Sequence, residues 1–403
     1  MKPQSTLTIT KPSGNKLMLI IFILTMFFSV ISQTLDNQIS SVSRIGMYLF
    51  WLLTGLFLVY QLKLGFKVPK FGIVYLIRYT ILLIVMFSSI ILNNEHANTG
   101  ILLPLTISLG AYFIGAFLFQ INFTPKQLSK CLIAYVIFVC LLAIQIRVEY
   151  FTSLSDWMNQ MQNLYGKKNS AGQIFAVSII LLLFFFNYSS SRLITLLRFT
   201  AAGFLFYVML LIQCRSAMIS LAIVCLGRIF FLKKGKFKYL FLFLSIGALA
   251  LIYPDTRDII FKALYINKYA GTDLNTFSSG RLGYWEEGLK VFYEHILVGV
   301  GNYYVDNFYI NTLIQTGLLG FIIIVPIFLN RAWRNVKLKG ESNDKITISL
   351  FHIIKLLTVF YFIESFFEGY PPFGPGVCAF IFWLLSGYLD LLVNKKENTF
   401  EED

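Results

Sequence analysis

Charged residues are scarce in this 403-residue sequence, in which Asp, Glu, Lys and Arg together make up only 13% of the chain. Hydrophobic residues account for 57%, and the mean hydropathy is +0.70. Because ordinary soluble domains contain about 25% charged residues, this composition excludes a large soluble domain. The sequence therefore predicts an all-α polytopic membrane protein.

Paired cysteines with the spacing of a redox or zinc motif are also lacking. The five cysteines lie in or beside apolar runs, and none belongs to a C-x-x-C motif. This pattern argues against a disulfide framework or a zinc site, and we expect the cysteines to be small buried hydrophobic residues. We predict no metal site and no cofactor.

Apolar segments that could cross a bilayer recur along the chain. A spanning helix needs about 20 apolar residues. Twelve segments are candidates: 17–34, 45–62, 71–92, 100–122, 131–148, 172–189, 195–212, 216–231, 239–253, 306–329, 347–367 and 375–393. The first follows a lysine-rich N-terminus but lacks a small-residue cleavage site, so we interpret it as an uncleaved helix rather than a signal peptide.

The basic residues favour one orientation of these segments. The net charge is +14, and with the N-terminus inside, the cytoplasmic segments carry more than twice as many Lys and Arg residues as the opposite side. The positive-inside rule then places both termini in the cytoplasm. Most of the excess charge thus serves topology, which argues against a nucleic-acid partner. We expect one membrane domain over 1–403, a large periplasmic loop over 254–305 and a disordered cytoplasmic tail over 394–403.

The predicted loop 254–305 contains an amphipathic stretch, "RLGYWEEGLKVFYEHIL". Its apolar residues fall on one helical stripe: Leu282, Trp285, Leu289, Phe292 and Ile296. This spacing is typical of a helix that lies on the membrane surface. Arg281 stands at its start, where the free N–H groups of a helix favour anions. Arg281 is either a solvated loop residue or part of an anion site.

The loop ends in "GVGNYYVDNFYINTLIQTGLLG", which opens with Gly299 and Gly301. No strand precedes these glycines, so we reject a nucleotide-binding turn and expect them to turn the chain back into the membrane. Asp306 and Asn307 then fall in the first turn of the next helix, where Asp306 could be a cap or a functional carboxylate. Asn307 and Asn311 share a face, as a polar stripe along a groove would.

Further polar residues are expected on the same side of the membrane. Arg215 interrupts two apolar runs in "QCRSAMIS", where a charge is costly and is either structural or functional. Glu364 and Glu368 are four apart near the outer end of a span and are functional candidates for the same reason. Lys168 and Asn169 occur in "YGKKNSAG" just before a helix.

Two arginines and several carboxylates at this depth suggest a particular substrate chemistry. Arginine forks match phosphate oxygens in a bidentate manner, as the headgroup of a lipid pyrophosphate would require. A carboxylate could deprotonate an attacking hydroxyl group. Without a metal, the arginines would have to stabilise the departing charge.

These residues lie in motifs that resemble the superfamily of O-antigen polymerases and O-antigen ligases. The motifs are "GKKNSAG", "CRSAMISLA", "SSGRLGYWEEGLKVFYEHILVGVG", "DNFYINTLIQTGLLG" and "ESFFEGYPPFGPGVCAFIFWLLSG", and they cover mainly residues 160–390. The resemblance implies a twelve-span, metal-independent, inverting glycosyltransferase of the C-type in the bacterial inner membrane. Its donor would be an undecaprenyl-pyrophosphate-linked glycan at the periplasmic face, with Arg215 and Arg281 on the pyrophosphate.

The resemblance favours the polymerase branch. Ligases usually carry a His-Asn pair where this sequence has Asp306-Asn307. We expect a surface-polysaccharide polymerase with Asp306 as base, Glu368 as substitute, and a chain-length regulator as a possible partner. The expected substrate-binding residues are Lys168, Asn169, Trp285, Asn307, Asn311 and Glu364. The alternatives are a ligase that moves the glycan to lipid A core and, in another class, a polytopic transporter or flippase.

Overall fold

The computed structural model describes the chain from residue 12 to residue 400 with gaps. The described ranges are 12–34, 37–63, 65–93, 100–150, 168–186, 191–230, 280–301, 303–338, 344–374 and 378–400, together with 252, 254, 257–258, 260–261 and 275. Over these ranges the regular structure is helical and contains no β-strand.

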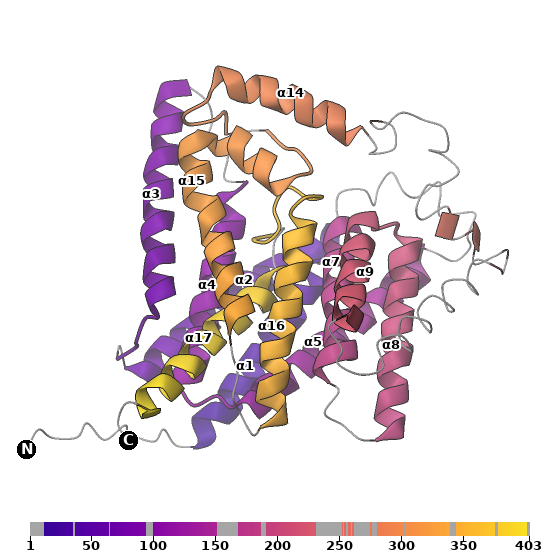
Figure 1. The fold of residues 1–403 in the computed structure, drawn as a ribbon. Helices are drawn as coiled ribbons and strands as arrows, with labels where there is room; N and C mark the ends of the chain where they lie inside the picture. The colour runs from indigo at the N-terminus through magenta and orange to yellow at the C-terminus, as the bar shows by residue number, and fades with distance from the viewer. Residues whose placement is uncertain are drawn as a thin grey trace, which may run out of the picture.

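The helices form one bundle with a single helix laid across one end (Figure 1). Their bounds are α1 Pro12–Ile31, α2 Asn37–Leu62, α3 Lys70–Asn93, α4 Leu102–Gln120, α5 Pro125–Tyr150, α7 Lys168–Ile180 with the π-helical turn η1 Leu181–Phe185, α8 Arg192–Leu211, α9 Arg215–Phe230, α14 Arg281–Glu294, α15 Phe308–Lys337, α16 Lys345–Glu364 and α17 Phe380–Phe400. The crossing helix is α14, which packs on α15. Helix α17 ends at the opposite end of the bundle from α14.

The prediction of an all-α multi-pass membrane protein is confirmed. Eight described helices are long and apolar enough to cross a membrane, and Lys16–Ile31 and Phe380–Val393 are shorter apolar helices. Segment 239–253 lies outside the described residues apart from Ile252. The expected total of twelve spans and the periplasmic location of loop 254–305 therefore stay predictions. Helix α17 includes residues 394–400, which the sequence analysis assigned to the tail.

Helices α4 and α17 pack backbone against backbone. A Cβ atom added to Gly387 would collide with the carbonyl group of Tyr112, and one added to Gly115 would collide with that of Leu384. Between apolar helices in a bilayer, van der Waals packing drives association, and small residues allow this close approach. The two glycines are therefore required by the packing of α4 on α17.

We expect Gly387→Ala to destabilise the protein by about 1–3 kcal/mol, the usual cost of overpacking a filled contact. Gly203→Ala in α8 is the matched control, because no atom beyond the adjacent backbone of its own helix lies within 4 Å of the added methyl group. That control should be neutral or slightly stabilising, since alanine favours a helix by up to about 1 kcal/mol over glycine. Thermal unfolding of both purified variants in detergent checks the pair. An equal midpoint for the two would contradict the packing argument.

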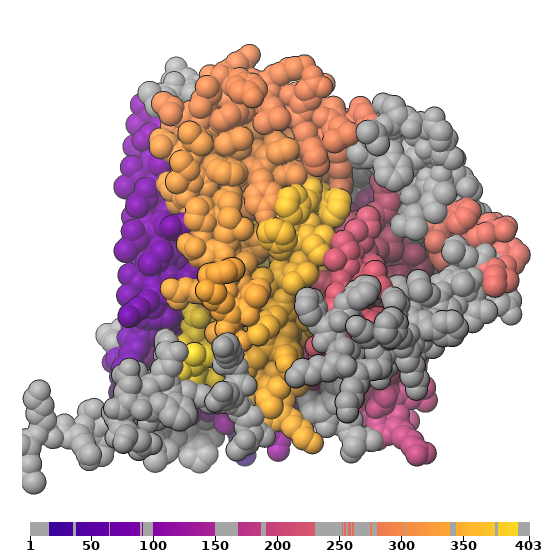
Figure 2. All heavy atoms as spheres, in the orientation of Figure 1, coloured from indigo at the N-terminus to yellow at the C-terminus, as the bar shows by residue number. Residues whose placement is uncertain are grey.

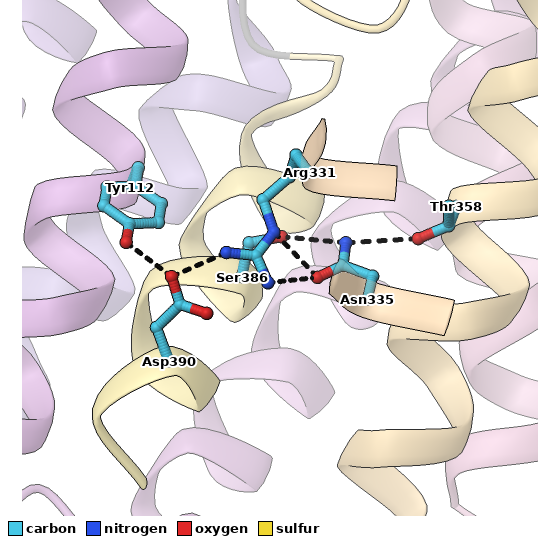
Figure 3. A network of polar contacts seen from close by, with 6 residues as sticks. All are labelled: Tyr112, Arg331, Asn335, Thr358, Ser386 and Asp390. Atoms are coloured by element: carbon cyan, nitrogen blue, oxygen red, sulfur yellow. Dashed lines mark hydrogen bonds and ion pairs between the residues drawn. The ribbon is translucent and has the colours of Figure 1, made fainter. Parts of the chain in front are cut away.

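A buried ion pair joins four helices at their core (Figure 3). Arg331 Nη1 of α15 lies 2.6 Å from Asp390 Oδ2 of α17, and Tyr112 of α4 donates to the same oxygen at 2.6 Å. The rest of the guanidinium donates to Asn335 Oδ1 at 2.8 and 2.6 Å. The Asn335 amide donates to Thr358 of α16 and to Ser386. The charge is thus neutralised and hydrogen-bonded, as a charge inside a membrane requires.

Helix α15 is broken at Gly317, where the backbone angles are φ 65° and ψ −172°. The loop that follows α14 fills the break. Its four backbone hydrogen bonds are Val300 N to Ile314 O at 3.0 Å, Gly301 N to Gln315 O at 3.0 Å, Leu318 N to Ile296 O at 2.8 Å and Leu319 N to Leu297 O at 3.2 Å. These bonds satisfy two freed carbonyl groups before the break and two freed N–H groups after it, as irregular backbone within a membrane needs.

The Gly-x-Gly sequence makes this docking possible. Gly299 has φ +67°, and a Cβ atom there would lie 2.5 Å from Gly317 N and from Ile314 O. Only glycine combines this conformation with such a close approach of two backbones. The turn that the sequence analysis expected is present, and its role is to lock the loop onto α15.

Candidate active site

Arg281 is held at the first position of α14 by the turn that precedes it. Gly280 adopts φ 80°, and its N–H donates to Asn275 O at 2.7 Å. The Asn275 side chain accepts from Gly283 N at 2.9 Å and so satisfies a free N–H group of the first helical turn. Gly288 on α14 is buried against Ile314 of α15, which fixes the helix over the site.

The segment before α15 presents Asp306 to Arg281. Asn307, and not Asp306, is the N-cap of α15: its Oδ1 accepts from Tyr309 N at 3.0 Å and from Ile310 N at 3.1 Å. The capping alternative for Asp306 is therefore wrong, because the helix begins at Phe308, after both residues. The Asp306 carboxylate remains available for chemistry and is about one-third exposed (33%).

Arg281 bridges two carboxyl groups. Its Nε lies 3.3 Å from Asp306 Oδ2, and its Nη2 lies 3.5 Å from Glu368 Oε1. Glu368 is only 5% exposed, whereas Arg281 is 24% exposed. Burial, with the neighbouring carboxylates Asp306 and Glu364, raises the pKa of Glu368 well above its usual range, while Arg281 opposes that rise. The site therefore holds a partly exposed carboxylate at Asp306 and, at Glu368, a buried carboxyl group that tends to be protonated.

Two serines of α9 donate hydrogen bonds to the buried carboxyl groups. Ser216 Oγ donates to Glu368 Oε1 at 3.1 Å, and Ser220 Oγ donates to Glu364 Oε2 at 2.6 Å. Glu364 is fully buried at the end of α16, and Glu368 lies in the turn that follows this helix. The sequence analysis missed both serines. Their signal was the four-residue spacing in "RSAMIS", which puts two hydroxyl groups on one face of α9 beside Arg215.

Lys168 at the start of α7 joins the same cluster. Its side chain is buried and interacts electrostatically with Arg215, Arg281 and Glu368. Its carbonyl group accepts from Cys214 Sγ at 2.6 Å, which ties α7 to the segment before α9. The fold thus brings Lys168, Arg215, Arg281 and Glu368 together from four distant parts of the chain.

The predicted asparagines serve the framework of the site. Asn311 Oδ1 accepts from Val305 N at 3.2 Å, and its Nδ2 donates to Gly369 O at 3.0 Å. Asn307 Nδ2 donates to Phe366 O at 3.2 Å. Together they fix the backbone that carries Asp306 relative to the turn that carries Glu368. This geometry differs from the expected polar stripe along a groove.

Two other predicted binding residues lie on the helices that carry Lys168 and Arg281. Asn169 is half-buried on α7 next to Lys168. Trp285 is half-buried on α14, one turn after Arg281, and its buried Nε1 has no hydrogen-bond partner among the described residues. Among the residues that the structure describes, no group of three or more His, Cys, Asp or Glu residues could hold a metal ion.

The raised pKa of Glu368 leads to a stability prediction. The fold favours the neutral form of Glu368. The contribution of this group to the free energy of unfolding is therefore fully present below the ordinary glutamate pKa near 4.5 and is lost as the pH rises through about 8, the raised pKa. Because glutamine is neutral at every pH, Glu368→Gln should flatten the dependence of the free energy of unfolding on pH by up to about 1.4 kcal/mol per pH unit in that window. Thermal midpoints from pH 5 to 8 measure it. Glu286→Gln on the exposed face of α14 is the control, and an unchanged slope in Glu368→Gln would refute the assignment.

Comparison with known proteins finds a match in the middle of the chain. Residues 199–325 match the family model described as O-antigen ligase. The resemblance to the O-antigen polymerase and ligase superfamily is confirmed. The matched region runs from α8 into the second half of α15 and contains Arg215, Arg281 and Asp306, whereas Lys168 and Glu368 lie outside it. No curated protein matches the sequence.

The superfamily match agrees with the membrane architecture. The eight described helices that could cross a membrane make the chain a multi-pass membrane protein, and residues 199–325 within it are similar to the O-antigen ligase family. The match does not separate polymerases from ligases.

Proposed function

We propose that this protein is a surface-polysaccharide polymerase that transfers a growing lipid-pyrophosphate-linked glycan onto a new lipid-linked repeat unit. The observation that carries the proposal is the bridge from Arg281 to Asp306 and Glu368 beneath α14. Lys168 and Arg215 add positive charge beside it. The arrangement provides cations for a pyrophosphate and a separate carboxylate for a hydroxyl group.

The proposed reaction is a displacement at the anomeric carbon of the donor. The acceptor hydroxyl forms the new C–O bond, and the bond from the anomeric carbon to the pyrophosphate oxygen breaks. Asp306 takes the hydroxyl proton, and the lipid pyrophosphate leaves with the electron pair. Arg281, Arg215 and Lys168 stabilise its charge in place of a metal ion. Attack opposite the leaving group inverts the anomeric configuration.

Asp306 suits the role of base better than Glu368. The raised pKa of buried Glu368 keeps it protonated near neutral pH, whereas Asp306 is partly exposed and freed from capping. In the free protein Arg281 holds both carboxyl groups. A pyrophosphate that binds the arginine would compete for it and release Asp306 toward the acceptor. Donor binding would in this way prepare the base.

A ligase is the second candidate, because the matched family model is described as O-antigen ligase. Its donor would be the same, so the cation cluster fits both functions. The acceptor would be lipid A core instead of another lipid-linked repeat. The active face would be periplasmic in either case, with both termini in the cytoplasm of a bacterial inner membrane.

The two functions differ in the substrates that they need. Purified protein given only the lipid-pyrophosphate-linked repeat unit should build a ladder of longer lipid-linked glycans if it is a polymerase. A ligase should leave the repeat unchanged until lipid A core is added, and should then transfer it. Gel separation of the labelled glycans distinguishes the two results. Absence of transfer under both conditions would exclude both functions.

A further inference from the structure

A second basic site lies between α3 and α15, away from the cluster under α14. Figure 2 shows α3 along one edge of the molecule beside the orange helix α15. A cavity of about 270 Å³ opens between the first turns of α3 and the last turns of α15. Its lining includes Phe71, Arg78, Asn330, Trp333 and Arg334, and no lining residue is acidic.

Arg78 is the unusual member of this lining. It is half-buried within a candidate membrane span, where a charged side chain needs a partner. Its Nη1 donates to Ile323 O of α15 at 3.4 Å, a long hydrogen bond to a neutral group. The ion pairs of the described residues do not involve Arg78. A guanidinium with further donors thus faces a cavity in the membrane region.

Arg334 supplies a second cation on the other wall. It is exposed, and its guanidinium lies 5.5 Å from the centre of the Phe71 ring. Its neighbour one turn earlier, Arg331, is fully buried and already neutralised by Asp390. Arg334 therefore adds a charge that the buried network does not use. Lys337 stacks over Trp333 at 4.2 Å and makes this end of the bundle more basic.

The surroundings of the cavity are apolar and exposed. Both walls belong to helices that are candidate spans. Two lining residues, Val74 and Trp333, are exposed apolar side chains, and their neighbours along the same two helices, Ile73, Ile77, Leu329 and Val336, are exposed as well. In a bilayer these side chains face acyl chains, and Trp is enriched where hydrocarbon meets headgroups. A ligand at the arginines would thus carry its charge between the helices and its apolar part along them.

We propose that this cavity binds the phosphate headgroup of an anionic phospholipid, with Arg78 and Arg334 on the phosphate. Arginine forks match phosphate oxygens, and basic pockets between membrane helices suit such headgroups. The basic end of the bundle corresponds to the cytoplasmic leaflet under the positive-inside rule, where anionic lipids accumulate. The lipid is a structural ligand at the opposite end of the bundle from α14, separate from the proposed glycan transfer.

Native mass spectrometry of the full-length protein in neutral detergent tests the proposal. Equal amounts of phosphatidylglycerol and phosphatidylcholine with identical acyl chains compete for the protein. At about 1 kcal/mol for each basic residue, two arginines correspond to a preference of roughly 30-fold for phosphatidylglycerol. The double variant Arg78→Gln/Arg334→Gln should lose that preference. Arg192→Gln on α8 is the matched control, because it removes one exposed arginine elsewhere and should keep the preference.

Two further measurements test whether the site recognises a lipid or a free phosphate compound, and whether the result depends on the folding of the double variant. Arg334→Gln alone changes an exposed residue and should reduce the preference several-fold even if the double variant fails to fold. Glycerol phosphate without acyl chains should not raise the thermal midpoint. Stabilisation by glycerol phosphate that Arg334→Gln abolishes would overturn the lipid as the source. The proposed site would be overturned if the wild-type protein showed no preference for phosphatidylglycerol over phosphatidylcholine. It would also be overturned if Arg334→Gln kept the full preference.

Discussion

Asp306→Asn should reduce glycan extension by about 10²–10⁴-fold, the usual effect of losing general-base help. The substitution keeps the size of the side chain but removes the group that accepts the hydroxyl proton. Because Asn307 is the cap of α15, the helix should keep its N-terminus and the protein its expression level. Arg281 also loses one carboxylate partner, so donor affinity should stay equal or rise. The loss should therefore fall on kcat and not on KM.

Two comparisons make the Asp306 result specific. Asp258→Asn alters an exposed aspartate that pairs with Arg257 in the expected loop, and it should extend glycan normally. Asn307→Ala removes the true cap and should cost about 1 kcal/mol of stability, with a modest effect on rate. In cells, Asp306→Asn should leave single-repeat glycan on lipid A core if a separate ligase is present. Normal long chains in Asp306→Asn would remove this residue from the mechanism.

Arg281→Lys should be nearly as damaging as Arg281→Ala, with an expected loss in kcat/KM of about 10²-fold or more for a charge-assisted contact that develops in the transition state. Lysine keeps the charge, but a single ammonium cannot replace the planar fork that reaches Asp306 and Glu368 at once. Donor binding and turnover of both variants, measured with the purified protein, give the split between KM and kcat. Arg257→Lys is the control, because it makes the same exchange at an exposed arginine.

The Arg281 result has a clear contrary outcome. Normal extension by Arg281→Lys would show that this position supplies charge only. A loss that is matched by lower expression or a lower thermal midpoint would show that the arginine holds α14 on the bundle and does not touch the donor. The first outcome would remove the bidentate fork from the mechanism, and the second would transfer the leaving-group role to Arg215 and Lys168.

Hydrophobic runs were sufficient to predict most of the bundle. Each candidate segment except 239–253 coincides with a described helix, because an apolar run of that length has few alternatives in a bilayer. The break in α15 was not predicted. Segment 306–329 has a continuous hydropathy signal. The break at Gly317 lies where Gly299 brings a second backbone against the helix, and hydropathy does not report such a contact.

The site was predicted in part for a similar reason. Charges in apolar surroundings drew attention to Arg215 and Glu368, because such charges are costly in a membrane. Positions at expected helix starts drew attention to Arg281 and Asp306. Which of them face one another depends on how α7, α9 and α14 pack, and spacing along the chain carries no such information. The network of Arg331 and Asp390 was missed because its members lie in separate helices. Arg331 looks like a topogenic residue in the sequence, and Asp390 lies near the end of a candidate span.

The docking of loop 296–301 into α15 also has a consequence for biosynthesis. The chain is made from its N-terminus, so the loop leaves the ribosome before the helix that it completes. When α15 enters the bilayer, its two halves have backbone groups at Ile314, Gln315, Leu318 and Leu319 that hydrocarbon cannot solvate. The earlier loop is already available to receive them. A circular permutation that placed α14 after α15 would keep every contact yet insert the broken helix with no partner, and it should be cleared by membrane quality control.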